Sequence, residues 1–186
     1  MSTFRRRLMA LSVEGTSTPP VSGYSYLVNT SGTASLVTDI PIGNNRIVAK
    51  YFILSSNQVP YITIYNGDSE YSFIRRGNGS YIASSNGSTS TTQVYKFQDA
   101  KILHETEWTL TNVIHDGTTI LTQDRSNQTF TIGVGRGISK IQSIIMYDEQ
   151  NNIVANLVPN TIDGVIGLYD TISEKIYGGD GYTLEV

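Results

Sequence analysis

The chain has no cysteine among its 186 residues. Disulfides and thiolate zinc sites are therefore excluded, and the fold does not depend on an oxidising compartment. Long apolar runs are missing too. None approaches the roughly 20 residues that a membrane-spanning helix needs, so we expect no membrane span. Charged residues are also scarce, at 16% of the chain.

The charge that is present is unevenly distributed. The net charge is −3, and Arg5, Arg6 and Arg7 stand together near the N-terminus, so the rest of the chain carries −6. An acidic body argues against nucleic acid as a partner, because phosphate binding needs a basic surface. We expect no secretion signal either, since the arginines are not followed by the apolar run of about 7–15 residues that a signal peptide has.

Convincing helical periodicity is missing from the interior of the chain, and short extended segments separated by turn residues take its place. This pattern predicts an all-β protein, a two-sheet antiparallel sandwich of the jelly-roll type. At this length we expect a single domain, with an arm and linker over 1–22 and the sandwich over 23–186. The expected strands are 24–29, 36–40, 46–54, 61–65, 70–75, 80–84, 94–97, 107–114, 118–122, 129–134, 139–147, 153–158, 165–169 and 175–177.

The segment 139–147 is expected to be a central strand, because both of its faces are partly apolar. Simple alternation places Ile144 and Met146 on one face. The other face then receives Ile141, Ser143, Ile145 and Tyr147. The next strand is expected to end before Pro159, since proline has no N–H to give to a sheet.

The stretch IIMYDEQNNIVANLVP, followed by DGVIGLYDTISEKIY, resembles the C-terminal half of the concanavalin A-like, laminin-G-like jelly rolls of many gut-bacterial and bacteriophage proteins. The matching positions are Tyr147-Asp148, Val154, Pro159, Asp163-Gly164, Gly167 to Asp170 and Lys175 to Tyr177. Near the N-terminus, Tyr26-Leu27 and Ser31-Gly32-Thr33 are similar to the family's first signature, whereas 34–39 departs from it. The resemblance implies the jelly-roll fold and leaves the function open, because jelly rolls host many roles.

The N-terminal arm has the pattern of an anchor. Phe4, Leu8 and Leu11 fall on one helical face, and Arg5, Arg6 and Arg7 lie between them. A Pro-Pro pair in 16–22 then reads as a linker. We therefore expect the arm to dock on another subunit or on a larger assembly, which makes a homo-oligomer or a multi-protein partner the expected state.

The chain has twelve tyrosines, and three of them suggest a binding surface. Tyr61 and Tyr65 alternate on one expected strand, and Tyr71 lies on its hairpin partner. A rigid aromatic face beside hydroxyl groups suits sugar stacking or a protein interface. The alternative is that this face belongs to the sandwich core.

Catalysis has one candidate pair, Glu105 and Glu107. Residues two apart on a strand lie roughly 7 Å apart, against about 5–5.5 Å between the carboxyls of a retaining glycosidase. No third acid alternates with them, so we interpret them as solvated strand charges and assign no catalytic residue. His104 and His115, the two histidines of the chain, are expected at the surface rather than as metal ligands.

Two other patterns are candidate ligand sites. Residues 133–137 are Gly-rich, but a strand rather than a helix follows them, so we expect a turn and not a phosphate cradle. The resemblance to laminin-G-like domains implies that calcium can be held at a rim. Asp39, Asp163 and Asp180 are the candidates there, and we assign no ligand.

These observations favour a non-enzymatic structural and interaction protein. The leading hypothesis is a bacteriophage virion component, such as a head or tail decoration or a fibre protein, held by its arm and displaying a lectin-like jelly roll. One alternative is a carbohydrate-binding protein on the surface of a gut bacterium. A glycoside hydrolase is the third. The expected location is the virion or, under the alternative, the bacterial cell surface.

Overall fold

The computed structural model describes residues 23–31, 34–53, 60–66, 69–76, 80–83, 94–96, 102–122, 131–134 and 139–186. For residues 53–96 and for Leu121 it describes the backbone only. Every helix or strand assigned in this part of the chain is a strand, which confirms the all-β prediction. No helix there has the length and apolar character needed to cross a membrane.

The described residues form the strands β1 to β16. In chain order they are β1 (Tyr26–Asn29), β2 (Leu36–Pro41), β3 (Arg46–Ile53), β4 (Pro60–Asn66), β5 (Ser69–Arg76), β6 (Ser80–Ala83), β7 (Val94–Lys96), β8 (His104–Trp108), β9 (Asn112–His115), β10 (Thr118–Thr122), β11 (Thr131–Val134), β12 (Ser139–Tyr147), β13 (Ile153–Ile162), β14 (Val165–Asp170), β15 (Lys175–Gly178) and β16 (Tyr182–Glu185).

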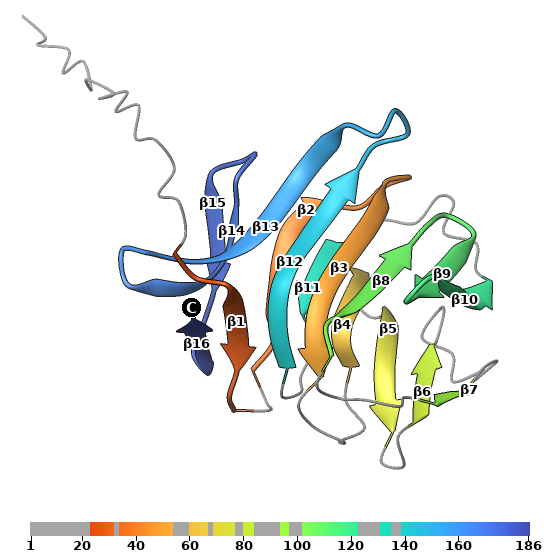
Figure 1. Cartoon of the computed structure of the whole chain (residues 1–186). Coiled ribbons are helices and arrows are strands. Elements are labelled where there is room, and N and C mark those ends of the chain that lie inside the picture. Colours follow the sequence, from red (N-terminus) through yellow and green to blue (C-terminus); the bar gives the residue numbers. More distant parts are fainter. Residues whose placement is uncertain are drawn as a thin grey trace, which may run out of the picture.

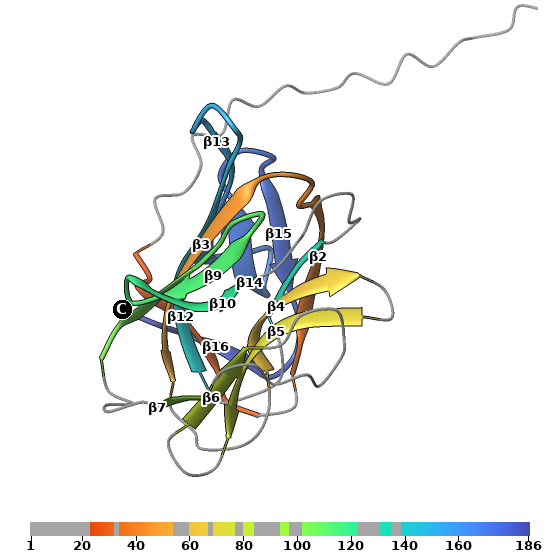
Figure 2. The same cartoon turned by 90° about the vertical axis from the view of Figure 1, so that its right-hand side faces the viewer.

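These strands form two antiparallel sheets that pack as a sandwich. Sheet A has ten strands in the order β10-β9-β8-β3-β12-β13-β14-β15, and β1 joins it by pairing with both β12 and β16. Sheet B has six, in the order β2-β11-β4-β5-β6-β7. In Figure 1, β12 and β3 lie in front of β2, β11 and β4, and the quarter turn of Figure 2 separates the two layers. The predicted two-sheet sandwich is therefore confirmed.

The core lies between the sheets and follows the alternation of the strands. In β2, Leu36, Thr38 and Ile40 are buried while the residues between them are exposed, as expected for a strand with one face on the core and one in solvent. Side chains of both sheets meet in one hydrophobic cluster. Its members include Leu36, Ile40, Ile132 and Val134 from sheet B and Leu27, Ile47, Ala49, Tyr51, Trp108, Ile144 and Leu157 from sheet A.

The strand β12 is central, as expected, but its faces differ from simple alternation. Its pairing with β3 shifts between Ile141 and Ser143, which places an extra residue, Gln142, in the strand. A bulge of this kind reverses the side on which later residues point. Ile141 is therefore buried together with Ile144 and Met146. The expectation that Ile141 shares a face with Ser143, Ile145 and Tyr147 was wrong.

Pro159 also lies differently from the expectation, because β13 continues through it to Ile162. The described pairing of β13 with β12 stops at Leu157, so a proline two residues later interrupts no ladder on that side. On the other side Pro159 pairs with Leu168 of β14. A strand tolerates proline where its missing N–H has no partner to meet.

The expected strand over 107–114 is in fact a hairpin of β8 and β9. Thr109 makes the turn, because its hydroxyl accepts hydrogen bonds from the N–H groups of Thr111 and Asn112, at 3.2 and 2.9 Å. Threonine side chains favour such local turns over a continuing ladder. The turn brings β9 back along β8 and so decides where His115 lies.

Two Asp-Gly dipeptides form tight turns. Asp116 and Gly117 have φ of 45° and 77° between β9 and β10, and Asp163 and Gly164 have 51° and 82° between β13 and β14. Positive φ at both central residues suits the tight hairpin turn that matches strand twist, and Asp-Gly adopts it at low cost. Local chemistry alone therefore specifies these two turns.

The C-terminal hairpin depends on Asp170, the last residue of β14. Its carboxylate accepts hydrogen bonds from the N–H groups of Asn156, Ile172 and Ser173 and from the Ser173 hydroxyl, at 2.6–3.2 Å. Burial raises the pKa of Asp170, but these hydrogen bonds lower it by more, so it lies below its ordinary value. The side chain therefore holds the turn to β15 and the adjacent strand β13 together.

We predict that Asp170→Ala lowers the free energy of unfolding by about 3 kcal/mol, because it leaves buried N–H groups without an acceptor. Urea denaturation measures this loss. Asp148→Ala is the matched control, since Asp148 also accepts turn N–H groups but is solvated, and its loss should be smaller. Equal losses in the two variants would contradict the role of burial.

Candidate functional site

One face of sheet A points away from the core and carries most of the described charges of β3 and β8. We call it the outer face of sheet A. The register pairs Lys50 with Glu105, Tyr147 with Arg46 and Phe52 with Lys140, so these side chains share one side of the sheet. Its defining residues are Tyr26, Arg46, Lys50, Phe52, Glu105, Glu107, Lys140, Tyr147 and Glu185.

The charges on the outer face are arranged in pairs. Lys50 lies 3.4 Å from Glu105, and Arg46 lies 3.5 Å from Glu107. Lys140 contacts Glu185 across β12, β1 and β16. Glu105 and Glu107 both lie on this outer side of β8, with side chains 51% and 25% exposed, and each faces a cation.

Aromatic side chains lie between these ion pairs. The Arg46 guanidinium sits 4.3 Å from the ring centre of Tyr147. Tyr26 and Phe52 meet edge to face with ring centres 5.5 Å apart, and the Lys140 ammonium lies 5.9 Å from the Tyr26 ring. All three rings are half-buried, so each keeps part of its surface available to a ligand.

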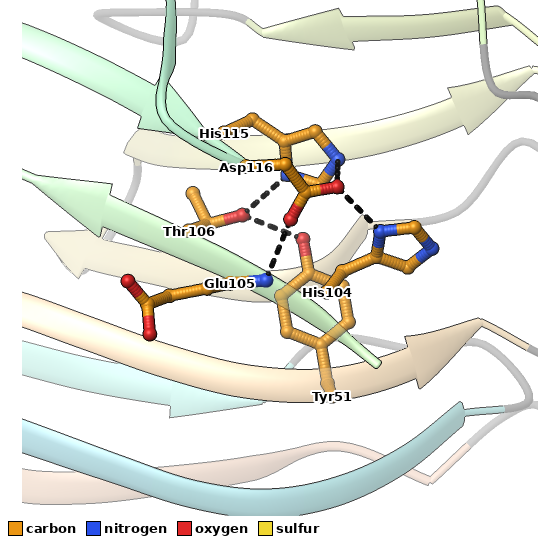
Figure 3. A network of polar contacts seen from close by, with 6 residues as sticks. All are labelled: Tyr51, His104, Glu105, Thr106, His115 and Asp116. Carbon is orange, nitrogen blue, oxygen red and sulfur yellow. Dashed lines mark hydrogen bonds and ion pairs between the residues drawn. The ribbon is translucent and has the colours of Figure 1, made fainter. Parts of the chain in front are cut away.

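A second polar group lies on the opposite, inner side of sheet A. Alternation along β8 sends His104, Thr106 and Trp108 inward, and the neighbouring strand β9 sends His115 the same way. The tight turn after β9 adds Asp116. Figure 3 shows His104, Thr106 and His115 around Asp116, with Tyr51 of β3 beside them. We call His104, His115 and Asp116 the histidine cluster.

Short contacts fix the histidine cluster. The Asp116 carboxylate lies 2.7 Å from His104 Nδ1 and 3.4 Å from His115 Nε2, and it accepts the Glu105 N–H at 2.9 Å. The Thr106 hydroxyl lies 2.9 Å from His115 Nδ1 and 2.8 Å from the Tyr51 hydroxyl (Figure 3). The two imidazole rings stack with centres 5.3 Å apart.

The electrostatics of the histidine cluster follow from its position. Burial, opposed by Asp116 and reinforced by His104, lowers the pKa of His115 to about 4. Burial raises the pKa of Asp116, but hydrogen bonds from the Glu105 N–H and His104 lower it by more, so it lies below its ordinary value. At neutral pH His115 is therefore an uncharged imidazole beside a carboxylate.

The expectation that both histidines lie at the surface was wrong. His104 is 2% exposed and His115 is fully buried. A signal for this was present in the sequence: His104 stands four residues before Trp108 on one strand, and residues an even number apart share a face. A buried tryptophan therefore implies a buried His104. The convergence with His115 depends on the β8–β9 turn, which local patterns did not reveal.

The other predicted site residues stand as follows. Tyr61, Tyr65 and Tyr71 lie in β4 and β5, where Tyr65 pairs with Glu70 and Tyr71 with Ile64. Their side chains are outside the described part, so the aromatic face they were to form stays a prediction. The same holds for the anchoring residues of the arm, which lie outside the described residues: Phe4, Arg5, Arg6, Arg7, Leu8 and Leu11.

The calcium candidates do not come together as a group. Asp39 contacts Lys175 at 2.7 Å and accepts the Tyr177 hydroxyl, which ties β2 of sheet B to β15 of sheet A. Hydrogen bonds from Lys175 and Tyr177 lower the pKa of Asp39, and burial raises that of Tyr177 to about 12. Among the described residues, one group of three potential ligands is found, and it contains none of Asp39, Asp163 or Asp180.

Comparisons with known proteins give little beyond this geometry. No protein-family model and no curated protein sequence matches the chain. Among solved structures, the chain is similar to galectin LEC-6 of Caenorhabditis elegans. The two are 11% identical over 69% of this chain and 99% of the galectin, with a TM-score of 0.48. The identity and the TM-score are both low, so no function is carried from the galectin to this chain.

We predict that the protein loses stability as the pH falls from about 6.5 to about 4. The unfolded chain protonates His115 near 6.5, whereas the folded chain resists protonation until about 4. The unfolded state thus gains protons first, and the loss reaches about 3 kcal/mol. Urea unfolding at stepped pH measures it.

His115→Gln is the control for this window, because it removes the titrating imidazole. His104 and Asp116 are the described titratable groups that face it. Carboxylates such as Asp116 and Asp170, whose pKa is already low, add their own loss only below about 3.8. Stability that stays level between pH 6.5 and 4.5 in the unaltered protein would contradict the prediction.

Proposed function

We propose that this protein is a non-enzymatic binding module that contacts carbohydrate through the outer face of sheet A. The observation that carries the proposal is the set of half-buried rings Tyr26, Phe52 and Tyr147 beside paired charges on a central sheet. Sugar rings present an apolar C–H face and a rim of hydroxyls, so they suit an aromatic surface bordered by fixed donors and acceptors.

The charge balance of this face favours neutral glycans. Its ion pairs involve three cations, Arg46, Lys50 and Lys140, and three carboxylates. Equal numbers of opposite charges give no net field to attract a polyanion. Their paired side chains instead present oriented donors and acceptors to hydroxyl groups.

The same pairs favour binding over hydrolysis. Glu105 and Glu107 are each beside a cation on an open strand face. A glycosidase instead needs two carboxyls with different roles placed on either side of one sugar bond. We therefore propose that the chain is not an enzyme. Hydrolysis of any glucan that is lost in Glu105→Gln would contradict this.

We predict that Arg46→Ala weakens binding of the best ligand in a panel of neutral oligosaccharides by at least tenfold. The change removes the cation that connects Tyr147 to Glu107. It should change the melting temperature little, because a partly exposed ion pair of this kind contributes only about 1 kcal/mol. Isothermal titration calorimetry measures the affinity, and a thermal melt measures the stability.

Lys175→Ala is the matched control, since Lys175 also forms an ion pair, an exposed one, but lies at β15, away from the outer face. It should bind the same oligosaccharide as the unaltered protein. Two outcomes would contradict the proposal: equal losses in both variants, or no binding to any oligosaccharide of the panel.

We further propose that the protein is a bacteriophage virion component, anchored by residues 1–22 and displaying the sandwich outward. The feature that favours it is the arginine-rich arm with Phe4, Leu8 and Leu11 on one helical face, followed by a Pro-Pro linker. Many anchored copies would strengthen a weak sugar contact through multivalency. Display on a bacterial cell surface would use the same geometry.

We predict that deleting residues 2–12 leaves the sandwich folded but abolishes oligomerisation or incorporation into the larger assembly. The reason is that the proposed anchor is confined to the arm, whereas every described strand begins after it. Circular dichroism checks the fold, and light scattering gives the mass of the assembly. An unchanged assembly mass would contradict the anchoring role.

A further inference from the structure

The histidine cluster has the composition of a metal site. His104, His115 and Asp116 each place one ligand atom within 4.8 Å of the others. The chain has two histidines in total, and the fold brings both to the same carboxylate. We propose that these three residues bind a divalent transition-metal ion of the zinc class.

The ligand atoms lie within 4.8 Å of one another, so the group would close by up to about 1.5 Å around such an ion. Ligands about 2.0–2.1 Å from a tetrahedral zinc lie roughly 3.3 Å from one another. His115 Nε2 and Asp116 already stand 3.4 Å apart. His104 Nδ1 is closer to the same carboxylate, at 2.7 Å. If these two atoms moved apart by about half an ångström, each could bind the ion instead of sharing a hydrogen bond with the other.

The surroundings orient the ligands in the way that metal sites need. When His115 Nδ1 donates to the Thr106 hydroxyl, Nε2 keeps its lone pair toward Asp116. Thr106 is held in turn by Tyr51, and the Glu105 N–H holds the other oxygen of Asp116. These are the supporting contacts that fix ring tautomer and carboxylate direction in metal centres (Figure 3).

The donor set also selects the class of ion. Two imidazoles with one carboxylate suit zinc, cobalt or nickel, whereas calcium and magnesium prefer oxygen ligands alone. The imidazoles are buried, and Asp116 is 37% exposed, so an ion has a route to the cluster past this side chain. A bound ion would tie β8 to the turn between β9 and β10.

Titration of the full chain with zinc chloride tests the proposal. The protein is made without a histidine tag and stripped with a chelator. Calorimetry should show one ion bound per chain. The melting temperature should rise by several degrees at a free zinc concentration about 100-fold above Kd, because the ion binds only the folded state. Cobalt chloride should give visible absorption bands typical of nitrogen and oxygen ligands.

Asp116→Asn is the decisive variant, because asparagine also tolerates the positive φ of this turn but is a poorer ligand. It should weaken zinc binding at least tenfold, whereas Asp148→Asn, a carboxylate in another turn, should leave it unchanged. Equal affinity in Asp116→Asn would place the ion elsewhere and overturn the proposal. If that variant does not fold, the zinc titration of the unaltered protein still tests the proposal. No heat of binding and no rise in melting temperature there would overturn it, and the cluster would then be a hydrogen-bond network only.

Discussion

The fold depends on the contact between the inner faces of two sheets, and β3 and β12 form the centre of the larger one. Ala49 and Ile144 face each other across these strands, and both are fully buried. Burying such apolar surface is the main favourable term in folding. This contact also decides where the functional residues lie, because the side of sheet A that does not pack against sheet B becomes the outer face.

Alternation carries this constraint to the functional residues. In β8, His104 and Thr106 point to the core, whereas Glu105 and Glu107 point outward. A register shift of one residue would exchange the two sets, placing carboxylates in the core and imidazoles in water. Two contacts favour the observed register: the ion pair of Lys50 with Glu105 and the hydrogen bond between the hydroxyls of Tyr51 and Thr106.

The sequence predicted what is decided locally. Asp116-Gly117 and Asp163-Gly164 specify tight turns because both positions need positive φ, and alternation in Leu36–Pro41 specifies a half-buried strand. Features decided by distant contacts were missed. The bulge at Gln142 and the passage of β13 through Pro159 both depend on where neighbouring strands begin and end, which no local pattern contains.

The histidine cluster shows the same division in one place. The spacing of His104 to Trp108 was a local signal of its burial that the prediction of a surface histidine overlooked. A buried imidazole is stable only with partners, since an unpaired polar group in the core costs free energy. Its partner, Asp116, lies twelve residues later and is brought back by the β8–β9 hairpin. The hairpin therefore creates the cluster, and the cluster in turn holds the hairpin against β3. Such mutual dependence explains how two buried imidazoles are accommodated beside Thr106 on the core side of these strands.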